Sequence, residues 1–247
     1  PTLGAELLVN SDVPNRCGVG SSAAVTVASI QAFALLYDLE LTPFELGRLA
    51  QLVEHEVLRV DARASCAMAA VMAEPGELMM LRGAAADLER RIQMPSDLEI
   101  VGLETGTQSA PDGRVQDVGD EAGRAARFAD LLAQPPAPSL RDELGDLLFR
   151  SHEAYRAAGL SNEACDLVVD FLRARRADGG AVFGARITGR GGGGTVLLVG
   201  ERGKVWYEAL RAKKALNQAT GHSGHVFRWS SPGAAAFGAI DLQPKTA

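Results

Sequence analysis

The chain has 247 residues, of which 47% are hydrophobic and 23% are charged, and its formal net charge is −6. This length accommodates one large domain or two smaller ones, each with its own core. The acidic balance argues against a nucleic-acid partner, which would require a basic stripe. It leaves a nucleotide ligand open, because backbone N–H groups and one or two basic residues suffice to hold phosphate.

Neither a membrane nor an oxidising compartment is indicated. No apolar stretch of about 18 residues occurs, so we expect no membrane partner. The first residues, PTLGAELLVNSDVP, lack the layout of a secretory signal. The three cysteines are widely spaced, which is typical neither of a disulfide framework nor of a zinc site. We therefore expect a cytoplasmic protein.

The first third of the chain is predicted to be mainly helical. Residues 5–9 indicate a short strand. Apolar residues recur almost all round a helical pattern over 21–39, which predicts a buried helix. The threonine, proline and glutamate within 42–45 are typical of the start of a second, amphipathic helix, which we expect to extend to residue 58. A third helix, rich in small residues, is predicted over 64–74.

Helices and strands alternate in the remainder. Residues 76–82 and 97–105 are predicted strands that flank a polar turn. Residues 111–127, rich in Asp, Gly and Arg, are expected to be irregular, and 134–139 (QPPAPS) is the clearest loop signal. We then expect two helices, a strand–glycine turn–strand unit, a helix and two closing strands, over residues 142–159, 162–177, 183–200, 206–221, 225–231 and 237–243. This alternation indicates an α+β fold with helices laid on an antiparallel sheet.

A glycine-rich bend precedes the first long helix, where residues 14–24 read PNRCGVGSSAA. Gly18 and Gly20 allow positive φ and the close approach of a ligand. The helix N-terminus that follows offers unpaired N–H groups and the positive end of its dipole, which together suit phosphate. Ser21 and Ser22 add hydroxyls that can bond phosphate or reach a magnesium ion. The alternative interpretation is a turn with serine caps and no ligand.

A second glycine-rich stretch, GARITGRGGGG, covers residues 184–194. Four consecutive glycines cost stability in regular structure, roughly 0.5–1 kcal/mol each relative to alanine. Close backbone packing around a turn or a ligand explains such a run, and a long hairpin loop is the alternative. Arg186 and Arg190 flank the glycines, where they either neutralise phosphate or are solvated.

Both stretches resemble motifs of the GHMP kinases, the superfamily of galactokinases, homoserine kinases and mevalonate kinases. PNRCGVGSSAA resembles their phosphate loop, and FGARITGRGGGGTVLLVG their third motif, which packs against that loop. FRSHEAYRAAGLSNEACDLVV and SSPGAAAFG then follow as in L-arabinokinases and related galactokinases. The resemblance implies ATP and Mg²⁺ as cofactors and a small-molecule sugar as substrate. It implies a nucleotide site formed by Gly18, Val19, Gly20, Ser21, Ser22, Ala23, Gly191, Gly192 and Gly193.

The same resemblance implies an α+β fold in two parts. Residues 1–95 would be a partial GHMP kinase N-terminal domain of the ribosomal-S5-domain-2-like type, and residues 96–247 the ferredoxin-like C-terminal domain. These kinases carry a long segment before the phosphate loop. The chain is therefore expected to be a fragment, a natural truncation or one half of a split protein. As its oligomeric state we hypothesise a homodimer.

The catalytic residues depart from the family pattern. Glu54 matches the magnesium ligand of these kinases, so the resemblance implies a metal site at Ser22 and Glu54. The family's aspartate, which faces the sugar hydroxyl, falls on Cys66 in a gapless alignment and on Ala69 in a shifted one, and the nearest acid is Asp61. The catalytic base is thus unassigned, and Cys66 reads most simply as a small buried apolar residue.

Two functions from different classes remain. The leading one is an ATP- and Mg²⁺-dependent sugar kinase of the L-arabinose or galactose type. The missing aspartate does not exclude it, because phosphoryl transfer depends chiefly on positioning and charge stabilisation. The rival is a catalytically silent relative that binds nucleotide or a partner without phosphoryl transfer.

Overall fold

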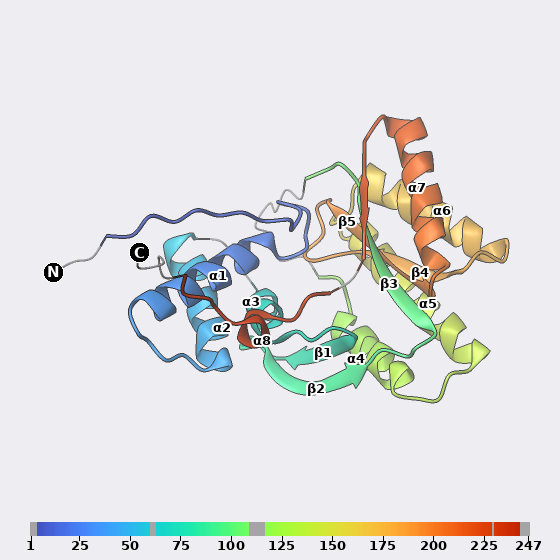
Figure 1. Ribbon diagram of the computed structural model, residues 1–247. Coiled ribbons are helices and arrows are strands. Elements are labelled where there is room, and N and C mark those ends of the chain that lie inside the picture. Colours follow the sequence, from blue (N-terminus) through green and yellow to red (C-terminus); the bar gives the residue numbers. More distant parts are fainter. Residues whose placement is uncertain (1–3, 60–62, 109–116, 229, 243–247) are drawn as a thin grey trace.

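The computed structural model describes residues 4–59, 63–108, 117–228 and 230–242 (Figure 1). The elements follow in the order α1 (Ser21–Leu36), α2 (Pro43–Leu52), the π-helical segment η1 (Val53–Val57), α3 (Ala64–Met72), β1 (Glu77–Arg82), β2 (Asp87–Gln93), β3 (Leu98–Glu104), α4 (Glu121–Leu132), α5 (Pro138–Ala157), α6 (Glu163–Ala177), β4 (Val182–Ile187), β5 (Thr195–Glu201), α7 (Val205–Thr220), β6 (His225–Phe227) and α8 (Ala234–Phe237). Across the described ranges, no helix combines the length and the apolar character needed to cross a membrane.

Helices α1, α2 and α3 pack together around a small apolar core formed by Val27, Leu46, Ala50, Ala67 and Val71. The predicted start of the second helix is confirmed, because the Thr42 hydroxyl accepts a hydrogen bond from the Glu45 backbone N–H at 3.3 Å. The hairpin β1–β2 follows α3, and its strands are antiparallel.

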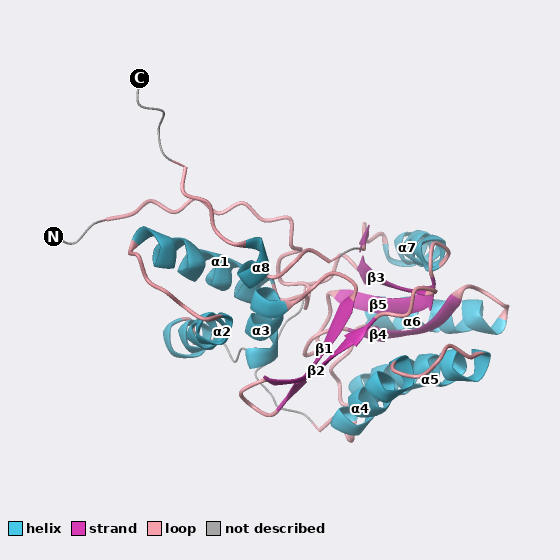
Figure 2. Cartoon of the chain, turned by 60° about the horizontal axis from the view of Figure 1, so that its bottom comes forward, coloured by secondary structure: helices cyan, strands magenta, loops and turns pink. Residues whose placement is uncertain are grey.

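A four-stranded antiparallel sheet with the order β4-β5-β3-β6 forms the other part of the molecule. Helices α5, α6 and α7 lie around this sheet, away from α1, α2 and α3 (Figure 2). The core between them is large and made mostly of Val, Leu, Ile and Ala side chains from α6, α7 and the strands. The predicted α+β class with an antiparallel sheet is confirmed.

The end of the chain returns to the helices of the beginning. Helix α8 packs on α1 and α3. Gln31 donates a side-chain hydrogen bond to the Ala234 carbonyl at 2.8 Å, and the Gly233 N–H donates to the Ala73 carbonyl at 2.7 Å. The segment around α8 therefore lies beside α1 and α3 (Figure 1). The domain boundary near residue 95 stays a prediction.

Several predicted elements are wrong for identifiable reasons. Residues 5–9 form no strand: Leu8 is 94% exposed, and no neighbouring strand among the described residues pairs with them. Residues 237–242 form no strand either, since Phe237 ends α8. The turn expected after residue 82 leads into β2, so β1 and β3 belong to different sheets. Helix α4 begins at residue 121, inside the stretch 111–127 expected to be irregular.

Helix α1 is not buried all round. Ala23, Val27 and Ala34 are buried, whereas Leu35 and Leu36 are 46% and 54% exposed. Helices α2, α3 and α8 cover only part of its apolar surface, so the remaining apolar side chains are exposed.

Helix α5 lies directly against β4 at two glycines. A Cβ atom on Gly145 would lie 1.8 Å from the Phe183 carbonyl oxygen, and one on Gly184 would lie 2.5 Å from the Gly145 Cα. Backbone atoms on both sides of the contact leave no flexible side chain that could move away.

We therefore expect Gly145→Ala to destabilise the protein, although alanine is the better helix former. Overpacking of this kind costs typically 1–3 kcal/mol and lowers the melting temperature in thermal unfolding. Arg150→Ala, at an exposed position of the same helix, is the control and should melt close to wild type. A Gly145→Ala melting temperature equal to that of the control would contradict the close packing.

Candidate functional site

The first glycine loop ends at an uncapped helix terminus. Gly18 and Gly20 have φ values of 73° and 81°, as the sequence predicts. Gly20 is the N-cap of α1, and no described side chain caps that terminus. Ser21 Oγ instead accepts the Arg16 N–H at 3.4 Å. The serine-capped turn is therefore wrong, and the first N–H groups of α1 remain free to bind an anion.

The second glycine loop packs backbone to backbone on the first. A Cβ atom on Gly194 would lie 2.4 Å from the Cys17 carbonyl oxygen, and one on Gly189 would lie 3.0 Å from the Gly18 carbonyl oxygen. Gly191, Gly192, Gly193 and Gly194 all have positive φ. The glycine run is thus required by the close approach of the two loops as well as by the turn between β4 and β5.

Glu54 is a buried acidic residue. Its exposed fraction is 2%, and it lies in η1, a π-helical turn of the kind often found at functional sites. Among the described residues it accepts no hydrogen bond and forms no ion pair. Helix α1, which carries Ser22, packs on η1. No group of three or more His, Cys, Asp or Glu side chains that could hold a metal occurs in the described ranges.

Cys66 lies beside the first glycine loop, in the first turn of α3. A Cβ atom on Gly20 would lie 3.9 Å from the Cys66 Cβ. Burial raises the pKa of the Cys66 thiol, and the Glu54 carboxylate raises it further, whereas Arg63 and Arg190 lower it. The net shift is upward, so the thiol is protonated at neutral pH and is no base.

A groove of about 1680 Å³ opens between the first glycine loop, α1, α3 and the segment around α8. Cys66 and Ala69 both line this groove, so Cys66 is not merely a core residue. Asp12 lines it too, a carboxylate that sequence reasoning missed because it lies in an irregular segment ahead of the glycines. Asp61 falls outside the described residues.

The arginines that flank the second glycine loop differ in role. Arg186 forms an ion pair with Glu121 and lies over the Tyr155 ring, so its charge is already paired. Arg190 is close enough to Cys66 for its charge to lower the pKa of that thiol.

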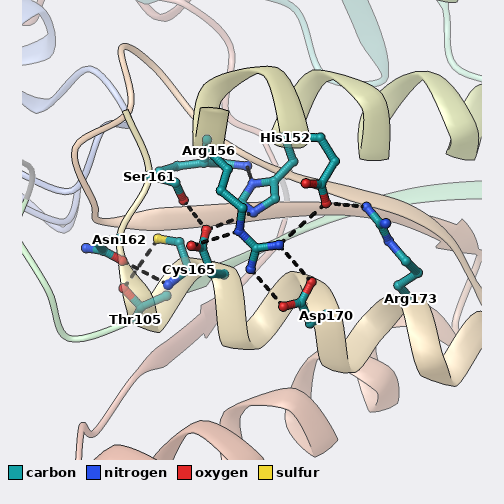
Figure 3. Close-up of polar contacts among 11 residues, drawn as sticks. Thr105, His152, Arg156, Ser161, Asn162, Cys165, Asp170 and Arg173 are labelled. Carbon is teal, nitrogen blue, oxygen red and sulfur yellow. Dashed lines mark hydrogen bonds and ion pairs between the residues drawn. The ribbon is translucent and has the colours of Figure 1, made fainter. Parts of the chain in front are cut away.

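A polar network lies at the start of α6, next to the turn that contacts the second glycine loop (Figure 3). Asp166 accepts a hydrogen bond from the Ser161 hydroxyl at 2.5 Å and pairs with the Arg156 guanidinium at 2.9 Å. Arg156 also reaches Asp170 at 2.7 Å. This network fixes the turn between α5 and α6, and the Leu160 carbonyl in that turn accepts the Gly192 N–H at 2.7 Å.

His152 is the fully buried member of this network. Its Nδ1 accepts the Ile187 backbone N–H at 3.3 Å, and its Nε2 lies 3.2 Å from Asp166 Oδ1. The imidazole is therefore neutral with its proton on Nε2, the tautomer that these two neighbours assign. Burial lowers the pKa of His152, and the nearby Asp166 charge offsets this in part.

We expect acidification to destabilise the protein partly through His152. The unfolded imidazole takes up a proton below about pH 6.5 while the folded one does not, so the unfolding free energy falls as pH falls through that value. Urea unfolding at pH 7.5 and 5.5 measures this loss, which is at most about 1.4 kcal/mol per pH unit for one group. His152→Gln should show a smaller loss between the two pH values, and an identical loss would contradict the assignment.

Comparison with known proteins shows that the chain is similar to several kinases. Residues 2–73 match the model of the GHMP kinases N terminal domain. The chain is 23% identical to an L-arabinokinase of Arabidopsis thaliana over 96% of its own length, and 30% identical to a mevalonate kinase of Thermococcus sibiricus over 79%. It spans 34% and 60% of the lengths of these two relatives.

The fold is also similar to that of a solved galactokinase. The Lactococcus lactis enzyme, crystallised with galactose, superposes with a TM-score of 0.71 at 16% identity, over 94% of this chain and 69% of that one. The relatives and the structural neighbours are thus GHMP kinases. The predicted fold class is confirmed: residues 2–73 match the N-terminal domain of the GHMP kinases, and the fold of the chain is similar to that of the solved galactokinase.

Proposed function

We propose that the chain acts as an ATP- and Mg²⁺-dependent kinase that transfers a phosphoryl group to a hydroxyl of a monosaccharide of the L-arabinose or galactose type. The observation that carries this proposal is the uncapped N-terminus of α1. It follows directly on the first glycine loop, whose backbone is in contact with that of the second. An N-terminus of this kind binds phosphate through its free N–H groups and its dipole.

In this proposal the residues from Gly18 to Ala23 hold the phosphates of ATP. The glycines at 191–193 close the nucleotide site, and Ser22 and Glu54 hold the magnesium ion. Glu54 is buried and forms no ion pair or hydrogen bond with the other described residues, and a buried carboxylate is costly unless a cation or donor reaches it, so Glu54 fits this role. When bound, the ion neutralises charge on the phosphates.

Glu54→Gln tests the nucleotide site. We expect it to remove the magnesium-dependent part of ATP binding and to weaken ATP affinity about tenfold or more, since contacts to charged groups contribute roughly 1.5–3 kcal/mol. Titration calorimetry with ATP, with and without magnesium, measures both effects.

Glu56→Gln is the matched control, because Glu56 lies two residues away on η1 and is 51% exposed. It should bind ATP like wild type. Folded wild-type protein that binds no ATP at millimolar concentration would overturn the proposed function.

The choice of a sugar as acceptor is supported by the resemblance of residues 149–169 and 230–238 to L-arabinokinases and galactokinases. The relatives also include mevalonate kinases. Assays of ADP release with L-arabinose, galactose and mevalonate distinguish these acceptors. The homodimer and the cytoplasmic location remain predictions.

A second candidate is favoured by Cys66. Its protonated thiol stands where the resemblance places an aspartate, as expected of a relative that binds nucleotide without transferring phosphate. Nucleotide binding without ADP release for any hydroxyl acceptor would support this candidate over the kinase.

If the chain is a kinase, we expect Cys66→Ala to leave turnover and ATP affinity close to wild type, because a protonated thiol accepts no proton from the substrate. Loss of a general base would instead lower turnover about 10²–10⁴-fold. Steady-state ADP release measures turnover, and a loss of that size at unchanged ATP affinity would contradict the assignment.

A further inference from the structure

We infer that Asn162, Thr107 and Thr105 are positioning residues that hold the second glycine loop against the phosphate loop and thereby set nucleotide affinity. The inference rests on the proposed function for its link to ATP. None of the three lines the groove, so they act through the loops and not on the ligand.

The three side chains form a hydrogen-bonded relay that ends on Gly194. Asn162 Nδ2 donates to Thr107 Oγ1 at 3.0 Å. Thr107 Oγ1 lies 2.7 Å from Thr105 Oγ1, which donates to the Gly194 carbonyl oxygen at 2.8 Å. Because the Thr105 proton is committed to Gly194, the proton between the two hydroxyls belongs to Thr107. The relay therefore runs in one direction, from Asn162 to Gly194.

Gly194 is held at both of its polar groups. Its N–H donates to Thr107 Oγ1 at 3.3 Å, and its carbonyl oxygen accepts from both the hydroxyl and the backbone N–H of Thr105, each at 2.8 Å. Thr105 is fully buried, so these bonds are shielded from competing water. The opposite side of Gly194 faces Cys17, against which a Cβ atom would clash. These hydrogen bonds therefore fix the contact of Gly194 with the phosphate loop.

The donor end of the relay is anchored to α6. Asn162 Oδ1 accepts the Cys165 backbone N–H at 2.9 Å as the N-cap of that helix, which fixes the orientation of the amide (Figure 3). The next residue back, Ser161, is held by Asp166. Gly193 also packs here, since a Cβ atom on it would lie 2.5 Å from Asn162 Nδ2. One amide thus caps a helix and orients a loop.

The test compares Thr107→Val with Thr107→Ser in the full chain. Valine keeps the shape but interrupts the relay, whereas serine keeps the hydroxyl. We expect Thr107→Val to weaken ATP binding about three- to tenfold, since each lost hydrogen bond has a modest net effect, and Thr107→Ser to restore it. Hydrogen–deuterium exchange should rise in peptides covering residues 189–195 for valine and not for serine. Melting temperatures show whether the effect is global.

A second variant guards against misfolding by the first. Asn162→Asp keeps the cap acceptor of α6 but replaces the donor amide with a carboxylate, which draws the Thr107 proton away from Thr105. Exchange over 189–195 should again rise, with a melting temperature near that of wild type.

The outcomes separate the two proposals. If wild type fails to bind ATP, the proposed function fails, and faster exchange in the variants still supports the relay. Wild-type exchange over 189–195 in both Thr107→Val and Asn162→Asp would overturn the relay. Faster exchange at unchanged ATP affinity would overturn its link to the nucleotide.

Discussion

The contact between Gly194 and Cys17 is the constraint on which the candidate site depends. Two backbones meet there with no room for a side chain. Cys17 precedes the glycines that bring the chain into α1, and Gly194 precedes the central strand β5. The contact therefore ties the start of a helix in one part of the fold to the sheet of the other. Any ligand at the α1 terminus lies beside that junction.

Rigidity around this junction comes from half-buried polar side chains that each bond to more than one neighbour. Asp166 gathers a hydroxyl and a guanidinium, and Asn162 uses its oxygen on a helix and its amide on a loop. Networks of this kind specify one arrangement because any half-satisfied alternative leaves a buried polar atom unpaired. The glycine loops, which by composition are the most pliable segments of the chain, are thereby given a defined shape.

Local features of the site could be predicted from sequence. The positive φ of Gly18 and Gly20 and the helix beginning at Ser21 follow from the residues themselves. The resemblance points to Glu54, but its burial depends on how η1 packs. The relay through Thr107 could not be predicted, because it joins three segments that only the fold brings together. The strand expected at 5–9 fails for a related reason: strand formation depends on a neighbour, which no local pattern reveals.

The return of the chain end to α1 has a consequence for synthesis. Gln31 and Ala234, which are hydrogen bonded, are separated by 203 residues. At a translation rate of about 5–20 residues per second, roughly 10–40 s pass between the emergence of α1 and that of α8. During that interval the side of α1 that faces the groove lacks its covering segment. The groove therefore forms only after the segment around α8 has been synthesised, long after α1 itself.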